Sequence, residues 1–235
     1  QQLQPMGTPE ALSADKLAQV RDQFVRSAML GIEAGFDGVE LHGANGYLLE
    51  QFLHPRSNQR ADAYGGSVRN RARFVLEVTR AVAEAVGADR TGIRLSPWST
   101  ANDLTHYPEI DEAYAYLAEE LGKIGIVYVH LVDHSRLSHV DSAAATASLV
   151  RDSFSGTVIH AGGYTTLTEI EQALADPRPS LVAMARPFIA NPDLVERLRL
   201  GLPLAEPERA TFYAPGPTGF ADGYTDYPVA ATADR

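Results

Sequence analysis

The sequence predicts part of an eight-stranded parallel β/α barrel, namely strands four to eight with their helices. Short β-branched runs bounded by turn residues alternate with longer amphipathic stretches of helical period, which is typical of βα units in a parallel sheet. Five strands cannot close such a barrel, and the Gly-rich fingerprint of a doubly wound sheet is missing after the first strand. Because no strand precedes the first predicted helix, we expect strands one to three to lie outside these 235 residues.

The individual elements follow from the same two periodicities. The predicted strands are Phe36–His42, Thr91–Pro97, Val127–Asp133, Thr157–Gly163 and Leu181–Arg186. The predicted helices are Ser13–Ala34, Val68–Val86, Asp111–Lys123, Ala143–Asp152, Leu167–Ala175 and Pro192–Leu200. Ser13 is suited to cap the first helix, and Pro192 suits a first helical turn. Two long loops, His54–Ser67 and the Gly-, Pro- and Tyr-rich tail Tyr213–Pro228, are candidates for function because loops of that size often carry it.

Composition limits the class of protein. With 235 residues and 45% hydrophobic content, the chain suits one domain over residues 1–235. A net charge of −10 without any Lys/Arg-rich run argues against nucleic acid as a partner. The absence of cysteine excludes disulfides, thiolate nucleophiles and iron–sulfur ligation, and we predict no metal site. No stretch approaches the roughly 18 apolar residues of a membrane span, so we expect a soluble, cytoplasmic protein.

Polar residues follow the first predicted strand, where a barrel of this kind carries its catalytic groups. His42 and Asn45 are both hydrogen-bond donors, and from one strand end they can converge on a carbonyl oxygen and stabilise negative charge on it. Tyr47 is a nearby candidate proton donor. The alternative is that His42 and Asn45 satisfy the backbone of their own loop.

Two further strand ends carry cations. Arg94 lies inside a run that otherwise suits the core, and a buried guanidinium needs an anionic or polar partner. That partner is either a ligand or a protein carboxylate. Gly162-Gly163 and Arg186 follow the last two predicted strands, where barrels often bind phosphate. The alternative for the glycines is an ordinary turn.

These residues belong to a longer set of spaced motifs. The set comprises GFDGVELHGANGYLLEQFL at 35–53, Ser57-Asn58, Tyr64-Gly-Gly-Ser67, Asn70-Arg71, Ile93-Arg-Leu-Ser-Pro97, Ala161-Gly-Gly163, Ala185-Arg-Pro-Phe188, Asn191-Pro-Asp193, Phe212-Tyr213 and Gly223-Tyr-Thr-Asp-Tyr-Pro228. Over nearly the whole chain it resembles the Old Yellow Enzyme family. The resemblance implies an FMN-containing (β/α)8 barrel. Such an enzyme takes a hydride from NADPH or NADH and passes it to a small activated alkene or nitro substrate.

The resemblance also implies roles for single residues. His42 and Asn45 would bind the carbonyl or nitro oxygen of the substrate, so that the β-carbon accepts hydride from the flavin, and Tyr47 would protonate the α-carbon. Arg94 would lie beside the N1/C2 carbonyl edge of the flavin. The phosphate-binding residues would be Gly163 and Arg186, helped by the backbone amides of Gly162 and Ala185. Tyr213 would lie near the flavin and the substrate entrance.

The chain also departs from the family pattern. A first-strand threonine and a third-strand glutamine that contact the flavin have no counterpart, Arg69 stands where glutamate is frequent, and Trp98–Tyr107 matches nothing assigned. An alternative function is therefore a non-catalytic fragment that needs a complementing N-terminal segment or that self-associates. A phosphate-binding aldolase or isomerase barrel is a weaker alternative, because the strand ends carry no lysine. Zero cysteines exclude the iron–sulfur branch of the family.

Overall fold

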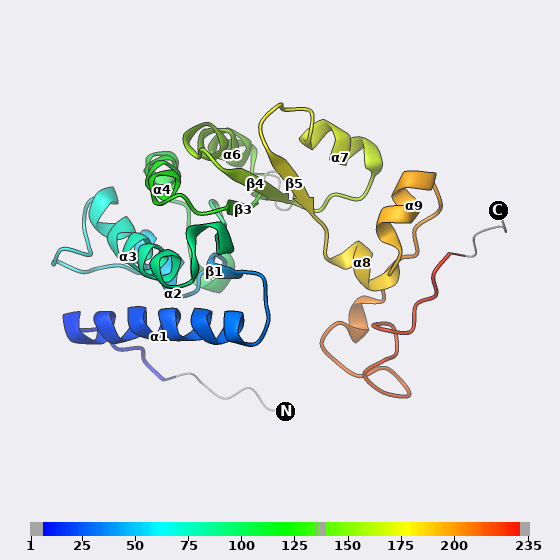
Figure 1. Ribbon diagram of the computed structural model, residues 1–235, viewed down its shortest axis with the longest axis horizontal. Helices are drawn as coiled ribbons and strands as arrows, with labels where there is room; N and C mark the ends of the chain where they lie inside the picture. Colours follow the sequence, from blue (N-terminus) through cyan, green and yellow to red (C-terminus); the bar gives the residue numbers. More distant parts are fainter. Residues whose placement is uncertain (1–6, 135, 137–139, 231–235) are drawn as a thin grey trace.

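A computed structural model describes residues 7–134, 136 and 140–230, and these form a single parallel sheet covered by helices (Figure 1). The sheet has five strands in the order β1-β2-β3-β4-β5, and every neighbouring pair is parallel. The strands are β1 Val39–Gly43, β2 Thr91–Leu95, β3 Tyr128–Val132, β4 Thr157–Ala161 and β5 Ser180–Ala183. Sequential parallel order is what successive βα units produce. The predicted number and direction of the strands are therefore confirmed.

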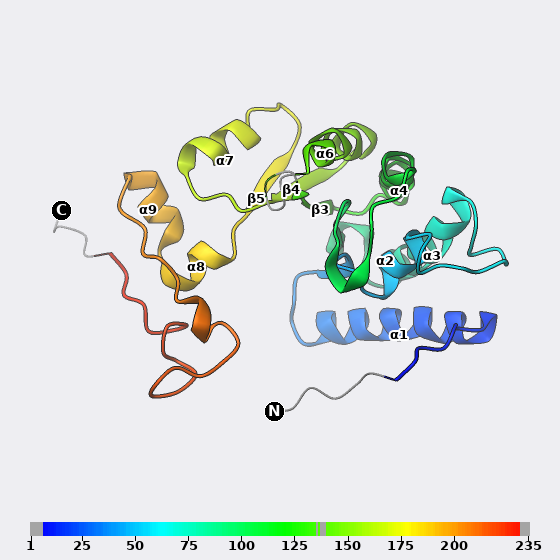
Figure 2. The same ribbon diagram turned by 180° about the vertical axis from the view of Figure 1, so that it is seen from behind.

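Helices lie on the outer side of the curved sheet, and both views show α1 and α9 at its opposite ends (Figures 1 and 2). The helices are α1 Ala14–Glu33, α2 Leu48–Leu53, α3 Val68–Val86, α4 Ile110–Ile124, α6 Asp141–Ser153, α7 Leu167–Ala173, α8 Arg186–Ala190 and α9 Leu194–Leu200. Three short 3₁₀ helices are η1 Ala88–Arg90, η2 Ala101–Asp103 and η3 Arg209–Thr211. Over the described part of the chain, no helix combines the length and apolar character that crossing a membrane requires.

Side-chain caps begin several of the helices. The Ser13 hydroxyl accepts a hydrogen bond from the Lys16 amide at 3.3 Å, which confirms the predicted cap of α1. Ser67 caps α3 in the same way. Thr166 and Glu169 form a reciprocal capping box at the start of α7. Each cap satisfies a backbone N–H that the first helical turn leaves free, which contributes about 1 kcal/mol.

The two faces of the sheet differ in character because side chains alternate along a strand. The face toward the helices is apolar, and its buried side chains include Leu41, Ile93, Leu95, Val129, Leu131 and Val158. The opposite, concave face of β1 to β3 instead carries Glu40, His42, Arg94, Tyr128 and His130. Polar side chains thus line the inner face of the curved sheet, where a ligand is accessible to them.

Several predicted boundaries were wrong. The first strand begins at Val39 instead of Phe36, and β4 ends at Ala161, two residues before Gly163. The last strand ends at Ala183, so Arg186 begins α8 instead of ending a strand. Pro192 precedes α9, whose N-cap is Asp193. Helices α2 and α8 were missed because they have six and five residues, less than two turns, and therefore show no helical periodicity.

The buried imidazole of His54 predicts a pH dependence of stability. Its Nε2 lies 2.5 Å from the Thr105 carbonyl oxygen, and its Nδ1 accepts the Arg56 amide at 3.1 Å, so the ring is neutral. Burial, together with the positive charges of Arg56 and Arg71, lowers the pKa of His54 below 6.5. The unfolded chain therefore binds more protons just below pH 6.5, and the free energy of unfolding should fall as the pH drops through that value.

Chemical denaturation at pH 7.5 and pH 5.5 tests this expectation. In His54→Gln, whose side chain can donate to Thr105 without titrating, the loss of stability between the two pH values should be smaller than in the wild type. An equal loss in both proteins would assign the pH dependence to other groups.

Candidate active site

Strand register brings three polar side chains into one row, of which His42 and Arg94 were predicted site residues and His130 was not. His42 on β1 lies opposite Arg94 on β2, and Arg94 lies opposite His130 on β3. Neighbouring strands are about 4.8 Å apart, so the three side chains emerge side by side on the concave face. His130 Nδ1 contacts a Glu40 carboxylate oxygen at 2.9 Å. The row ends where β1 passes into the loop that carries Asn45 and Tyr47.

That loop is a tight turn between β1 and α2. Asn45 and Gly46 both have positive φ, 56° and 74°. Glycine is required at position 46, because a Cβ there would lie 2.4 Å from the Ala101 carbonyl oxygen. Asn is one of the few other residues that adopts this conformation readily. The turn places Tyr47 at the N-cap of α2, with its ring centroid 5.3 Å from that of His42 in an edge-to-face arrangement.

His42, Asn45 and Tyr47 are accessible on this surface. His42 and Tyr47 are exposed, and Asn45 is half-buried. The side-chain amide of Asn45 makes no hydrogen bond with the described residues, so it does not satisfy its own loop. Burial and the positive charge of Arg94 lower the pKa of His42, which favours the neutral ring with one N–H donor. The three side chains are thus brought together on one surface; the ring of His42 has a hydrogen bond with the backbone of Ala44 in its own loop, whereas the side-chain polar groups of Asn45 and Tyr47 make none with the described residues.

In the described part of the chain, Arg94 makes no hydrogen bond and no ion pair, although its charge interacts with that of Glu40 on β1. Its Nε is buried without a hydrogen-bond acceptor, and it forms no ion pair with a described carboxylate. A buried guanidinium N–H without an acceptor costs free energy, so this position suits a polar or anionic ligand. The unpaired Nε fits the ligand alternative, and the charge interaction with Glu40 fits the carboxylate alternative, so the place of Arg94 beside a ligand stays a prediction. The negatively charged edge of a reduced flavin fits this requirement.

The predicted phosphate-binding residues follow two neighbouring strands, β4 and β5, on the side of the sheet away from β1. Ala161 at the end of β4 pairs with Ala183 at the end of β5, so Gly162-Gly163 and Ala185-Arg186 leave adjacent strand ends. Gly163 has a φ of 74°, and Arg186 is exposed with a free guanidinium among the described contacts. Glycine amides and a nearby cation are the groups that commonly bind phosphate.

Tyr213 is not brought to this site by the described residues. It lies on the tail that follows η3 and is 98% exposed, and its ring contacts that of Phe212 at 6.5 Å. Its predicted place near the flavin stays a prediction.

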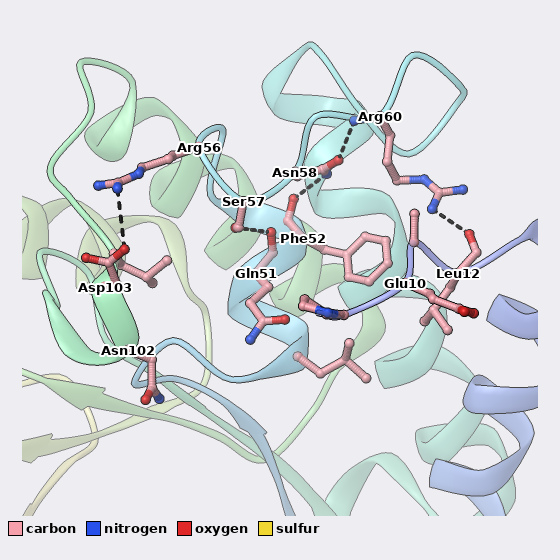
Figure 3. Close-up of a pocket in the computed structure, with 14 residues that line it drawn as sticks. Glu10, Leu12, Gln51, Phe52, Arg56, Ser57, Asn58, Arg60, Asn102 and Asp103 are labelled. Carbon is pink, nitrogen blue, oxygen red and sulfur yellow. Dashed lines mark hydrogen bonds and ion pairs between the residues drawn. The ribbon is translucent and has the colours of Figure 1, made fainter. Parts of the chain in front are cut away.

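Sequence reasoning missed four residues that bind the Asn45–Gly46 turn, namely Glu50, Gln51, Ser96 and Asn102. Glu50 has a recognisable signal, since it is the one carboxylate within the apolar run Leu48–Leu53. A hollow of about 510 Å³ lies between α2, η2 and the segment from Pro9 to Leu12. Figure 3 shows Gln51 and Asn102 among the residues that line it. The hollow is not lined by His42, Asn45 or Tyr47, so it adjoins the predicted site without being part of it.

Arg136 was also missed. Its Nε donates to the Gly162 carbonyl oxygen at 3.2 Å, its Nη2 donates to Glu169 at 2.7 Å, and its guanidinium lies 4.3 Å from the ring centre of Tyr164. These contacts hold the glycine segment after β4 against α7. No local pattern marks Arg136, because its partners are up to 33 residues away in the sequence.

Comparison with known proteins identifies the family. Residues 1–205 match the model of the NADH:flavin oxidoreductase / NADH oxidase family. The chain belongs to this family. Its predicted membership of the Old Yellow Enzyme group is confirmed by relatives and solved structures of that group.

Two curated relatives illustrate the similarity. Chanoclavine-I aldehyde reductase from Penicillium roqueforti is 45% identical over 233 residues, which are 95% of this chain and 61% of the relative. 12-oxophytodienoate reductase 2 from Arabidopsis thaliana is 44% identical over 223 residues, which are 94% of this chain and 58% of the relative. The chain therefore spans about 60% of the length of the curated relatives that it matches.

Solved structures agree with the predicted fold class. Morphinone reductase superposes with a TM-score of 0.90 at 41% identity, over 100% of this chain and 62% of that protein. Its complex with tetrahydroNAD superposes with a TM-score of 0.88. Since these neighbours are TIM-barrel proteins, the five strands correspond to part of such a barrel, as predicted.

Proposed function

We propose that this chain carries the substrate-activating and phosphate-binding parts of an FMN-dependent ene-reductase. The proposed reaction moves a hydride from NADPH or NADH, through FMN, to the β-carbon of an α,β-unsaturated carbonyl or nitro compound. The observation that carries the proposal is the row of His42 and Arg94 on adjacent strands, beside Asn45 and Tyr47. A cytoplasmic location remains part of the same proposal.

His42 and Asn45 act on the oxygen of the substrate. Each donates a hydrogen bond to that oxygen, and negative charge accumulates there as hydride reaches the β-carbon. Donors already fixed in place stabilise this charge more than they stabilise the neutral substrate, so they lower the barrier. The lowered pKa of His42 is compatible with this role, because the neutral ring keeps one N–H that can donate to the substrate oxygen.

Tyr47 supplies the proton. Its ring lies against His42, so a substrate oxygen held by His42 brings the α-carbon within reach of the Tyr47 hydroxyl. Proton donation at the α-carbon completes reduction of the double bond, and a positioned acid contributes about 10²–10⁴-fold to such a step.

Arg94, Gly162, Gly163, Ala185, Arg186 and Tyr213 are the residues proposed to hold FMN. When bound, the flavin accepts a hydride from the nicotinamide and donates it to the alkene. The buried Arg94 Nε offers a donor to the pyrimidine edge of the ring, and Arg186 with the glycine amides offers the phosphate end. These donor types fit the two ends of FMN.

The first test is a visible absorption spectrum of the purified full-length protein, recorded with its intact mass and during titration with a simple phenol. We expect a flavin spectrum that shifts on titration, because the phenol oxygen occupies the place of the substrate oxygen between His42 and Asn45. A protein without flavin and without a spectral response would contradict the proposed function.

A further prediction concerns the effect of Arg94 on the reduction potential of the flavin. Arg94→Met preserves length but removes the cation beside the reduced ring, so the flavin should become harder to reduce and its reduction potential should fall. Potentiometric titration against a reference dye measures this shift. Arg90→Met, in η1 directly before β2, is the matched control and should leave the potential unchanged. A potential that is equal in wild type and Arg94→Met would remove Arg94 from the flavin site.

A second candidate is that the chain works only with a complementing segment or a second copy. Leu181 on β5 is 55% exposed and Phe36 before β1 is 67% exposed. Among the described strands, β1 and β5 each pair on one side only, which leaves two sheet edges open to another strand. We propose that further strands or self-association cover them. Sedimentation of the isolated chain and of the full-length protein tests this, and a stable monomer of the isolated chain would contradict it.

A further inference from the structure

The Asn45–Gly46 turn is held by side chains from outside the turn. The Asn45 amide donates to Ser96 Oγ at 2.7 Å, and the Asn45 carbonyl oxygen accepts from Asn102 Nδ2 at 2.8 Å. The Gly46 amide donates to Glu50 Oε2 at 2.6 Å, and the Gly46 carbonyl oxygen accepts from Gln51 Nε2 at 2.7 Å. All four backbone polar groups of the two residues are therefore bound by side chains of Glu50, Gln51, Ser96 and Asn102, which we call the turn cage.

Glu50 connects the turn cage to the core. It is only 3% exposed, and its carboxylate accepts from Ser96 Oγ at 2.9 and 3.0 Å and from the Tyr114 hydroxyl at 2.7 Å. Burial raises the pKa of Glu50, while the surrounding donors oppose that rise. A buried carboxylate with donors on both oxygens is strongly restricted in position, because moving it leaves polar groups unpaired.

The turn needs such support because of its conformation. Positive φ at two successive residues is unfavourable for most sequences, and it persists where the surrounding structure enforces it. The direction of the Asn45 side chain depends on the backbone angles of Asn45 itself. A change in the turn therefore displaces the carboxamide that is proposed to bind the substrate oxygen.

We propose that Glu50 is a positioning residue that fixes the Asn45–Gly46 turn and thereby aims the Asn45 carboxamide at the substrate oxygen. The inference rests on the proposed function for its catalytic meaning, but the positioning itself is a property of the fold. Glu50 is buried behind the turn and acts through the Gly46 amide and Ser96, so its proposed role is indirect. The function of the carboxylate is acceptance of hydrogen bonds, not its charge.

Two substitutions at Glu50 distinguish a role of its hydrogen-bond acceptors from a role of its charge. Glu50→Gln keeps an acceptor oxygen for the Gly46 amide, and its new N–H₂ can face the Tyr114 hydroxyl, which can turn to accept. Glu50→Leu fills a similar volume but leaves the Gly46 amide without an acceptor. Glu119→Leu, an exposed carboxylate paired with Lys123 on α4, is the matched control.

The first readout is hydrogen exchange of the segment 43–49 in the flavin-loaded full-length protein. In Glu50→Leu we expect exchange there to be at least tenfold faster, with Glu50→Gln and Glu119→Leu close to wild type. Unchanged exchange of this segment in Glu50→Leu overturns the proposal. Equal acceleration in Glu50→Leu and Glu50→Gln also overturns it, because charge would then be the deciding property. If Glu50→Leu does not fold, Gln51→Leu provides the same readout, since Gln51 is exposed and binds the Gly46 carbonyl oxygen.

The second readout is the dissociation constant of a simple phenol, followed by the flavin spectrum. Loss of one neutral hydrogen bond weakens binding roughly 2- to 10-fold, so we expect Glu50→Leu to raise the dissociation constant of the phenol by about that factor and Glu50→Gln to restore most of the affinity. In an Asn45→Ala background the Glu50→Leu effect should disappear. A full effect in that background means that Glu50 does not act through Asn45. A wild type that binds no phenol contradicts the proposed function, whereas the exchange readout still decides whether Glu50 holds the turn.

Discussion

Alanine at both His42 and Asn45 is expected to leave FMN bound and to abolish most alkene reduction, with each lost donor lowering the rate roughly 10²–10³-fold. The reason is that the two side chains emerge from one strand end and its following turn, and the Asn45 carboxamide forms no hydrogen bond to the described protein. Their loss removes the stabilisation of the substrate oxygen, and it leaves untouched the residues that are proposed to bind the phosphate of FMN. Stopped-flow reoxidation of the reduced flavin by cyclohexenone measures the rate.

The two single variants and the flavin content are the controls. Each single variant should lose part of the rate, and the ratio of flavin to protein should equal that of the wild type in all three. Unchanged turnover in the double variant would overturn the assignment of His42 and Asn45. Loss of flavin from the double variant would instead show that the pair belongs to the cofactor site.

Replacing Tyr47 by phenylalanine is expected to slow protonation of the α-carbon by about 10²–10⁴-fold, the contribution typical of a positioned general acid. The change removes only the hydroxyl. The Tyr47 carbonyl oxygen still accepts the Gln51 amide at 2.9 Å, so the start of α2 is preserved. Because Tyr47 is 56% exposed and its hydroxyl makes no hydrogen bond to the described residues, a substrate can reach it. Reduction of the flavin by NADPH or NADH should be spared.

The two half-reactions measured separately distinguish the roles of Tyr47. Tyr116→Phe, on α4 beside Arg69, is a matched control and should alter neither half-reaction. Equal slowing of flavin reduction and flavin reoxidation in Tyr47→Phe would argue that Tyr47 shapes the site instead of donating the proton.

Local signals in the sequence were sufficient for much of the fold. The β-branched runs around Ile93 and Val129 predicted buried strands, and helix α3 has the predicted bounds, Val68–Val86. The Ser13 cap was predicted because capping depends on residues three positions apart. The short helices α2 and α8 escaped prediction because fewer than two turns give no periodic signal, and Arg186 was consequently placed on a strand.

The amino-acid sequence alone determined the fold class and the family, because both follow from the periodicity of the elements and from the spaced motifs along the chain. It also determined that His42, Asn45 and Tyr47 lie close together, because all three fall within six consecutive residues at one strand end. Tertiary structure decided the rest. Strand register set His42 beside Arg94, and it made neighbours of the strand ends that precede Gly162-Gly163 and Arg186. Side-chain contacts across 51 and 57 residues bound the Asn45–Gly46 turn to Ser96 and Asn102. Such partners leave no periodic trace in the sequence, because hydrogen bonds between distant segments depend on how the strands and loops pack and not on spacing along the chain.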